Sequence, residues 1–208
     1  MNTTNSHMEY FYLENLFVMV ATRDALLKSF FVLLLLVACG NIWAQDTKGE
    51  KYDMPAGWSA TGGAPDKYEM GIDKGAGRNG GDALTMKADK GKIRFGALAH
   101  KVNVDSCGFS GKRIRLSGYI KSEGLYKWGS MWLRVDDSFQ HVLSFDNMSK
   151  RPVKGTTGWT KYSLVVDVPV GATKVIYGGL LNGKGQIWFD DMKLEIVSDD
   201  VPLTDMEF

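Results

Sequence analysis

The clearest pattern in this chain is an alternation of apolar and polar residues over most of the sequence after position 57. In residues 112–121 the apolar side chains Ile114, Leu116 and Ile120 alternate with polar or basic neighbours. Successive side chains of a β-strand point to opposite faces of its sheet, so this spacing predicts a strand with one buried face. Residues 130–136 repeat the pattern in the same form.

Similar alternation predicts further strands, separated by turns that are rich in glycine. They are the segment around Trp58 and residues 68–72, 83–88, 93–104, 142–145, 159–168, 174–181 and 186–197, with an irregular stretch at 146–158. No segment after the first 45 residues shows the 3.6-residue period of a capped helix. Roughly eight or nine short strands with turns about every ten residues predict an all-β fold, a two-sheet antiparallel jelly-roll β-sandwich.

The phases of these strands also predict which side chains are buried. The expected core leucines are Leu116, Leu133, Leu164 and Leu194, whereas Arg113 is expected on an exposed face. Since a buried leucine contributes far more to stability than an exposed arginine, this assignment is open to a direct test by substitution.

The closing segment, residues 185–197, combines inward-facing Ile187 and Phe189 with Trp188, which is expected to be exposed. Two adjacent carboxylates follow these residues. A closing strand of this kind is typical of jelly-roll sandwiches that bind sugars.

The first 45 residues of the chain have the features of an export signal. Residues 29–39 form an apolar run that follows Lys28, with Arg23 a little upstream. A run of about ten apolar residues is too short to span a bilayer and suits the core of a signal peptide. A short membrane anchor is the alternative interpretation, and Met19 is a second candidate start.

Two processing sites compete within this leader. Cys39, preceded by Ala38, has the form of a bacterial lipoprotein box and is a candidate for lipidation, whereas Ala44 before Gln45 suits ordinary signal peptidase. Either route predicts an exported protein in the periplasm, at the cell surface or outside the cell. It would touch a membrane only through the leader or a lipid anchor. The expected boundaries are a leader at 1–45, a flexible linker at 46–56, the sandwich at 57–198 and a tail at 199–208.

Composition narrows the functional classes. A net charge of +1 over 208 residues argues against nucleic-acid binding that is driven by electrostatic attraction. After removal of the leader Cys107 is the only cysteine, which excludes an internal disulfide, and it is expected to be a small buried residue. The remaining histidines, His100 and His141, are too few for a His/Cys metal cluster, and no catalytic motif occurs. We therefore expect a protein that is not an enzyme.

The outward-facing residues of the predicted strands form a candidate ligand site. They combine stacking rings with charged groups that bind hydroxyls: Arg115, Tyr119, Trp132, Arg134 and Asp136, with His141 and Asn147 nearby and Trp128 in a loop beside Tyr126. Apolar sugar faces stack on aromatic rings, and charged groups hydrogen-bond to sugar hydroxyls. The alternative interpretation is an Arg–Asp network that holds strands together, with Trp132 half buried.

Paired carboxylates near the last strand suggest a structural calcium ion, the one cofactor that the sequence raises. Calcium takes several oxygen ligands, and Asp190 could supply one together with Asp73 and Asp53 from the N-terminal part of the sandwich. A salt bridge or turn hydrogen bonds are the alternative.

Several short stretches of sequence between Trp58 and Asp205 resemble those of a known family. They are the stretches 57–58, 68–73, 115–123, 132–136, 145–148, 151–159, 185–191 and 201–205. Together they resemble the small bacterial β-sandwich domains of the galactose-binding, carbohydrate-module type. Such domains occur attached to helix-turn-helix transcription regulators and also alone in exported proteins. The resemblance implies the sandwich fold, and through the wider fold it implies sugar binding; the expected leader and the lack of DNA-binding helices depart from the regulator-attached members.

These observations predict an exported, non-catalytic β-sandwich that binds a carbohydrate or another small polar ligand at the cell envelope. A structural or protein-interaction module of the envelope, tethered as a lipoprotein, is the alternative. A small glycoside hydrolase or lyase is a third interpretation, because a carboxylate pair could be assembled from many acids in the chain.

Overall fold

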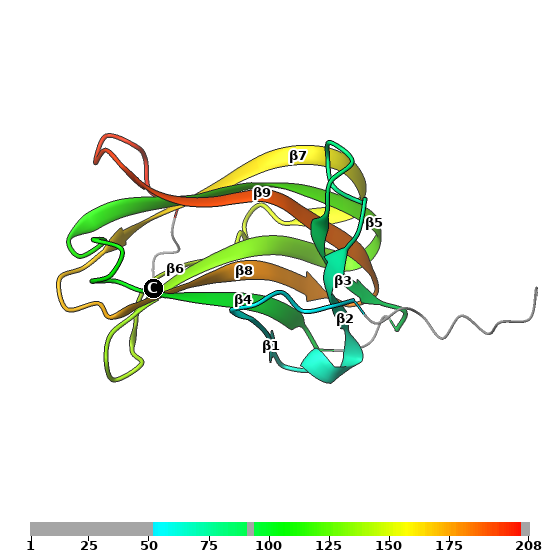
Figure 1. Ribbon diagram of the computed structural model, residues 1–208, viewed down its shortest axis with the longest axis horizontal. Coiled ribbons are helices and arrows are strands. Elements are labelled where there is room, and N and C mark those ends of the chain that lie inside the picture. Colours follow the sequence, from blue (N-terminus) through cyan, green and yellow to red (C-terminus); the bar gives the residue numbers. More distant parts are fainter. Residues whose placement is uncertain (1–51, 91–93, 205–208) are drawn as a thin grey trace, which may run out of the picture. The chain divides into compact units, whose positions relative to one another are not determined.

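The computed structural model describes residues 52–90 and 94–204, and these residues form an almost entirely β structure (Figure 1). One turn of 3-10 helix, η2 (Pro65–Lys67), interrupts the strands. The strands are β1 (Trp58–Gly62), β2 (Glu69–Asp73), β3 (Ala83–Ala88), β4 (Gly96–Asn103), β5 (Lys112–Asp136), β6 (Val142–Asp146), β7 (Val153–Val168), β8 (Lys174–Asn182) and β9 (Gly185–Val197). The predicted leader and lipidation site lie outside the described residues.

Strand β5 is shared between two layers, because it bends and runs back along the molecule (Figure 1). Its first half, residues 112–123, pairs with β7 on one side and β9 on the other. Its second half, residues 128–136, pairs with β8 and β6. Gly124, with a φ of 58°, lies at the bend, where a residue with a Cβ would be strained.

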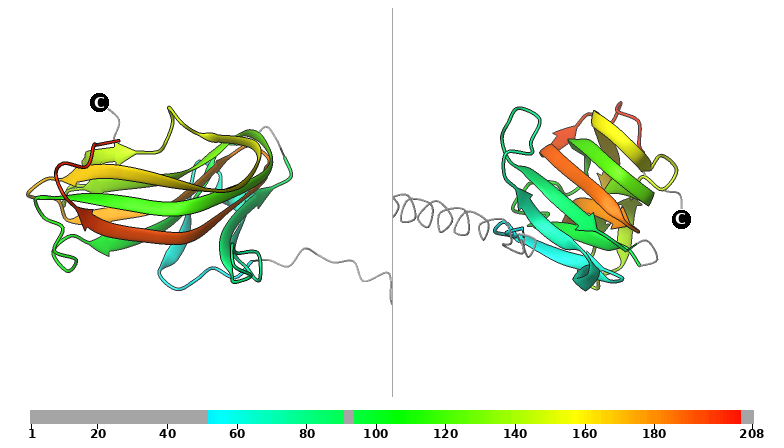
Figure 2. Two further views of the ribbon diagram at one scale, coloured as in Figure 1. Left: turned by 90° about the horizontal axis from the view of Figure 1, so that it is seen from above. Right: turned by 90° about the vertical axis from the view of Figure 1, so that its right-hand side faces the viewer.

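The two layers are named here by a central strand. The β9 sheet has the order β2, β3, β9, first half of β5, β7, and the β8 sheet has the order β1, β4, β8, second half of β5, β6. All of these pairings are antiparallel. Figure 2 shows β7, β5 and β9 in front of strands of the β8 sheet. The predicted two-sheet antiparallel sandwich is therefore confirmed.

The core lies between the sheets and follows the predicted alternation. Both halves of β5 contribute fully buried side chains, among them Ile114, Leu116, Ile120, Met131, Leu133 and Val135. Leu164 of β7 is also fully buried, as predicted, whereas Leu194 of β9 is only partly buried against the core. The apolar phase of β9 therefore weakens toward its end, where Ile196 is 49% exposed.

Two predicted strand boundaries are wrong. Residues 112–121 and 130–136 were expected as separate strands but form one continuous β5. The irregular stretch expected at 146–158 contains the start of β7, at Val153. This part of β7 pairs with β5 through a register that shifts at three places, and after Val153 its residues alternate only between exposed and partly buried positions. Apolar alternation is therefore absent there, although the backbone is paired.

Three predicted exposures are also wrong. Trp188 is buried, because its ring lies beneath the Lys121 amine at 4.3 Å and its Nε1 donates to Asp73 Oδ2 at 2.7 Å. Cys107 is exposed in the turn between β4 and β5, where Phe109 takes the buried position instead. Arg113 is only 15% exposed, because the carboxylate of Asp167 and the carbonyls of the tail surround it.

The segments that flank the strands also contact the sandwich. Thr204 binds Val165 through backbone and side chain, and its hydroxyl donates to Asp146 Oδ2 at 2.7 Å. Near the other end, Asp53 forms an isolated bridge with Ile72 of β2. No helix within residues 52–90 and 94–204 is long and apolar enough to cross a membrane.

Candidate functional site

A hollow of about 590 Å³ lies on the outer face of the β8 sheet. Its lining alternates along the three central strands, as expected for one face of a sheet: Ala97, Ala99 and Lys101 from β4, Trp128, Trp132, Arg134 and Asp136 from β5, Lys174, Ile176 and Leu180 from β8. Residues of β1 and β6 and of adjoining loops complete it: Ser59, Ala60, Thr61, Gly62, Phe95, Gln140, Phe145 and Asn147. The hollow is therefore a property of the sheet face and not of one loop.

Small residues in the middle strands and large residues at the margins create this hollow. Ala97 and Ala99 of β4 leave little side-chain volume above the sheet, and Gly178 of β8 leaves none. A Cβ at Gly178 would lie 1.9 Å from a main-chain oxygen of β4, so the strands approach closely there. The larger side chains of Trp128 and Phe145 lie at the edge of the hollow and pack against the apolar cluster that contains Ala97 and Ala99.

Trp132 belongs to the floor of the hollow and to the fold. Its side chain is only 7% exposed, and its indole Nε1 donates to Leu98 O at 3.0 Å and to Gly179 O at 3.2 Å. These carbonyls belong to β4 and β8, so one ring connects three neighbouring strands. The prediction that Trp132 is an exposed stacking ring is therefore wrong, although Trp132 does line the hollow.

The polar end of the hollow contains a partly satisfied ion pair. Arg134 Nη2 donates to Asp136 Oδ2 at 2.8 Å, and the Asp136 side chain is only 2% exposed. Within the described part of the chain, Asp136 Oδ1 and Arg134 Nε are buried without a hydrogen-bond partner. Buried polar atoms are normally paired, so these two unsatisfied atoms are unusual, although neither is exposed to solvent in this structure.

This pair does not hold strands together, which was the alternative interpretation. Arg134 and Asp136 lie two residues apart on the same strand, so their contact bridges nothing across the sheet. Arg134 and Asp136 pair only with each other among the described residues, and Trp132 is buried, so these residues also fit a structural role.

Two more predicted residues reach the hollow. Trp128 is partly exposed on its rim and belongs to β5, not to a loop as predicted. Tyr126, expected to form a platform with it, is 61% exposed and lies outside the lining. Asn147 contributes to the lining, with its Oδ1 accepting the Ser149 backbone N–H at 3.0 Å.

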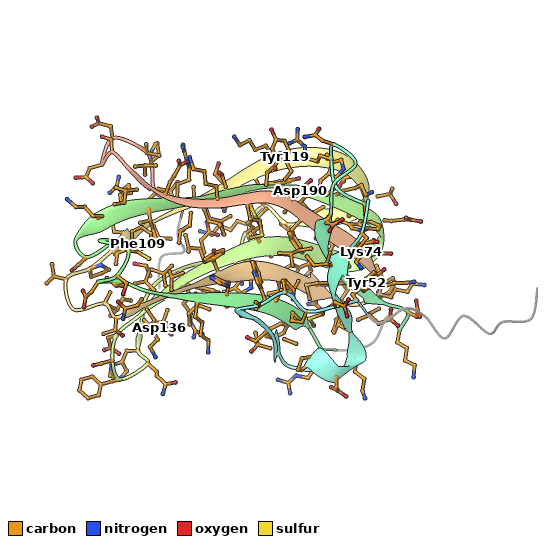
Figure 3. The ribbon with its side chains drawn as sticks, in the orientation of Figure 1. Tyr52, Lys74, Phe109, Tyr119, Asp136 and Asp190 are labelled. Carbon is orange, nitrogen blue, oxygen red and sulfur yellow. The ribbon has the colours of Figure 1, made fainter. Side chains whose placement is uncertain are left out.

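Three other predicted residues lie elsewhere. Arg115 and Tyr119 occupy the outer face of the β9 sheet, because the bend in β5 places its two outward sets on different sheets. Figure 3 shows Tyr119 near the upper strands and Asp136 near the lower ones. His141 lies in the β5–β6 loop, with its Nδ1 2.9 Å from Asp137 Oδ2, and its neighbour Gln140 lines the hollow instead. The prediction that all three gather around Trp132 is wrong.

Two of the three predicted calcium ligands, Asp190 and Asp73, accept hydrogen bonds from other residues of the sandwich. Asp190 accepts the backbone N–H groups of Arg78 and Asp191, each at 2.7 Å, and Asp73 accepts from the Trp188 indole. Asp53 is exposed. Among the residues that the structure describes, no three His, Cys, Asp or Glu side chains form a group that could hold a metal. These residues fit calcium poorly, and turn hydrogen bonds account for Asp190; the calcium site stays a prediction.

Sequence reasoning missed the contribution of β4 and β8. Lys101, Lys174, Ile176 and Leu180 all line the hollow, and none was singled out. Their alternation was visible, because Lys174 and Ile176 share one phase of the predicted strand at 174–181. What the sequence lacked was the information that β8 lies beside the second half of β5.

Comparison with known proteins gives a relative in sequence but no family, since no family model matches the chain. The chain is 39% identical over 155 residues to an uncharacterized HTH-type transcriptional regulator, YbfP, of Bacillus subtilis strain 168. The match covers 73% of this chain and 51% of the regulator. The chain thus spans about half the length of this curated relative.

Solved structures similar to this chain include carbohydrate-binding modules. The N-terminal CBM22-1–CBM22-2 tandem of Paenibacillus barcinonensis Xyn10C matches with a TM-score of 0.50 and 14% identity, over 74% of this chain and 45% of the tandem. The enzymatically active domain of bacteriophage CBA120 tailspike protein 4 matches with a TM-score of 0.50 and 12% identity, over 73% and 21%. At such low identity these likenesses show the fold, a β-sandwich shared with carbohydrate-binding modules.

Proposed function

We propose that the hollow on the β8 sheet binds a carbohydrate and that the chain does not turn it over. The observation that carries this proposal is the pairing of a partly exposed aromatic rim, Trp128 and Phe145, with buried polar atoms that have no partner among the described residues. Such a mixture suits a ligand that has both apolar faces and hydroxyl groups.

The chemistry divides between the two ends of the hollow. A sugar ring that stacks on Trp128 buries its C–H face against the indole. Its hydroxyls then donate to Asp136 Oδ1, and the Arg134 guanidinium donates to a hydroxyl oxygen. Trp128, and not Trp132, is therefore the stacking ring of this proposal.

The lining also supports binding without catalysis. Hydrolysis of a glycosidic bond ordinarily needs two carboxyl groups on opposite sides of the bond. Among the residues that line the hollow, Asp136 alone carries a carboxylate, and its Oδ2 is engaged by Arg134. The shared fold with carbohydrate-binding modules agrees with this interpretation, although a fold alone does not determine a function.

The test is a glycan array followed by calorimetry on the purified protein. We expect specific oligosaccharide binding by the wild type, and roughly a tenfold or larger loss in Trp128→Ala from lost stacking. Trp159→Ala is the matched control, because Trp159 is a partly exposed tryptophan near Lys121 on the β9 sheet. A wild type that binds no glycan, or equal binding by the two variants, would refute the proposal.

We also propose that the chain is exported, as the apolar run at 29–39 predicts. Mass spectrometry of the protein isolated from its native cells tests this. A start at Gln45 or a lipidated Cys39 supports export, and an intact Met1 or Met19 terminus contradicts it.

A protein-interaction module is the second candidate, and one observation favours it. Phe139 is 78% exposed and Val142 43% exposed at the β5–β6 hairpin, next to Gln140 of the hollow. Neighbouring exposed apolar side chains mark contact sites in many proteins. Loss of a protein partner on Phe139→Ser, in a chain that binds no glycan, would favour this function.

A further inference from the structure

Three cationic side chains surround Ile176 on the floor of the hollow. Arg134 of β5 and Lys101 of β4 are its cross-strand partners on either side. Lys174 lies two residues away on β8 and therefore on the same face. All of them line the hollow, so its polar end is built mainly from positive charge.

The negative charge available to balance them is small. Asp136 is the cross-strand partner of Lys174, yet its Oδ2 forms a salt bridge with Arg134 at 2.8 Å. Neither Lys101 nor Lys174 has an ion pair within 4.0 Å in the described part of the chain. With one carboxylate against three cations, the lining has an excess of positive charge.

On the opposite face of the sandwich, three cations have carboxylate partners. On the β9 sheet, Arg115 and Lys193 both contact Glu195 at 2.6 Å, and Arg78 contacts Asp191 at 2.6 Å. Arg115, Lys193 and Arg78 therefore have carboxylate partners, whereas Lys101 and Lys174 line the hollow without an ion pair in the described part of the chain.

The spacing of the lysines suits a single anionic group above Ile176. Diagonal neighbours on adjacent antiparallel strands lie about 7–8 Å apart, with their Cβ atoms somewhat closer, and this relation holds for Lys101 and Lys174. Two long side chains at that separation can converge on one anion. Each ammonium supplies three hydrogen-bond donors in a compact charge.

We propose that the carbohydrate of this hollow carries an anionic group, a uronate carboxylate or a sulfate, bound between Lys101 and Lys174. This inference rests on the proposed carbohydrate function and specifies its substrate class. The neutral part of the ligand stacks on Trp128, and its acidic group lies over Ile176. Asp136 Oδ1 accepts from a hydroxyl and disfavours an anion in its own immediate position.

The experiment compares matched acidic and neutral ligands by calorimetry with the full chain. The probes are a panel of uronic-acid oligosaccharides, the same compounds with their carboxylates reduced to alcohols, and sulfated oligosaccharides. The variants are Lys101→Met/Lys174→Met and the control Lys112→Met/Lys154→Met, which removes equal charge from exposed positions outside the lining.

We expect the wild type to bind an acidic form about tenfold more tightly than its neutral counterpart, because partly exposed ion pairs contribute modestly. The preference should disappear in the hollow variant and in about 1 M salt, and it should persist in the control. A preference for sulfated over uronate forms would identify sulfate as the anion.

Equal binding of acidic and reduced forms would overturn this inference and leave the proposed function standing. The same holds if both double variants lose the preference equally, since the effect would then come from net charge. Absence of binding to every acidic and neutral glycan would overturn the proposed function itself.

Discussion

The two outer faces of this sandwich are built from similar residue types and differ in how those residues are paired. On the β8 sheet, small residues leave a hollow, and two buried polar atoms beside it lack partners among the described residues. On the β9 sheet, several outward residues contact one another. Arg115 and Lys193 share Glu195, and the Arg78 guanidinium lies 3.3 Å from the centre of the Tyr119 ring.

The comparison teaches that arginine, aspartate and aromatic residues in one phase of a strand do not by themselves mark a binding site. Both halves of β5 carry such a set, Arg115 and Tyr119 in the first and Trp132, Arg134 and Asp136 in the second. The difference lies in the neighbouring strands. β9 supplies Glu195 to Arg115, and the β2–β3 loop supplies Arg78 to Tyr119. Around the second set, β4 and β8 supply alanine, glycine and lysines that have no ion pair among the described residues.

The largest expected effect concerns the ring beneath the hollow. Trp132→Ala should lower the free energy of unfolding by about 3–5 kcal/mol, because it removes a buried ring and leaves a cavity between strands. Tyr119→Ala, on the opposite face, should cost about 1 kcal/mol, since that ring is partly exposed and mainly contacts Arg78. Urea unfolding of both variants measures the difference. Similar losses would mean that the two faces are equally important to the fold.

Truncation of a buried leucine should lower the stability of the protein by a similar amount on the inner face of either sheet. Leu116 of the β9 sheet and Leu133 of the β8 sheet are both fully buried, so each alanine variant should lose about 2–5 kcal/mol. Leu194→Ala should lose less than about 2 kcal/mol, because Leu194 only partly enters the core. Chemical denaturation checks this ranking. A Leu194 effect equal to the others would show that the end of β9 is more tightly packed than its exposure indicates.

Two arginines on the first half of β5 differ in how far their own side chains are buried and in how many groups they contact. Arg113 is 15% exposed and bridges Asp167 to the tail carbonyl of Val201, so Arg113→Ala should cost about 1–3 kcal/mol. Arg115 is 37% exposed and pairs with Glu195, so Arg115→Ala should cost less than about 1 kcal/mol. Thermal unfolding of the two variants is the measurement. The reverse order would contradict the assignment of Arg113 as an anchor of the tail.

Sequence reasoning predicted the fold well because period-two alternation is local. The inward phases of residues 112–121 and 130–136 require only that each segment be a strand with one buried face. The prediction of Arg113 as exposed used the same rule. It failed because the outward face is covered there by Asp167 and the returning tail, which are distant in sequence.

The candidate site could be predicted only in part, for a related physical reason. Alternation assigns a side chain to the outer face of its own sheet but does not say which sheet that is. Trp132, Arg134 and Asp136 were therefore grouped with Arg115 and Tyr119 across a bend that separates them. Lys101 and Lys174 were missed because their importance comes from lying beside Ile176 in a sheet whose strand order the sequence does not display.

The smallest expected effect is the loss of stability at low pH that comes from Glu195 on the outer face of the β9 sheet. Hydrogen bonds from Lys193 and then Arg115 lower the pKa of the Glu195 carboxyl from its ordinary value of 4.5 to about 2. A lowered folded-state pKa adds stability that is fully present above pH 4.5 and is lost as the pH falls toward 2. Glu195→Gln should therefore reduce the fall in melting temperature over that interval. Glu123→Gln, an exposed residue on β5, is the control and should leave the profile nearly unchanged. Equal flattening by both variants would mean that net charge, and not the Arg115–Glu195–Lys193 contact, governs the acid response of this face.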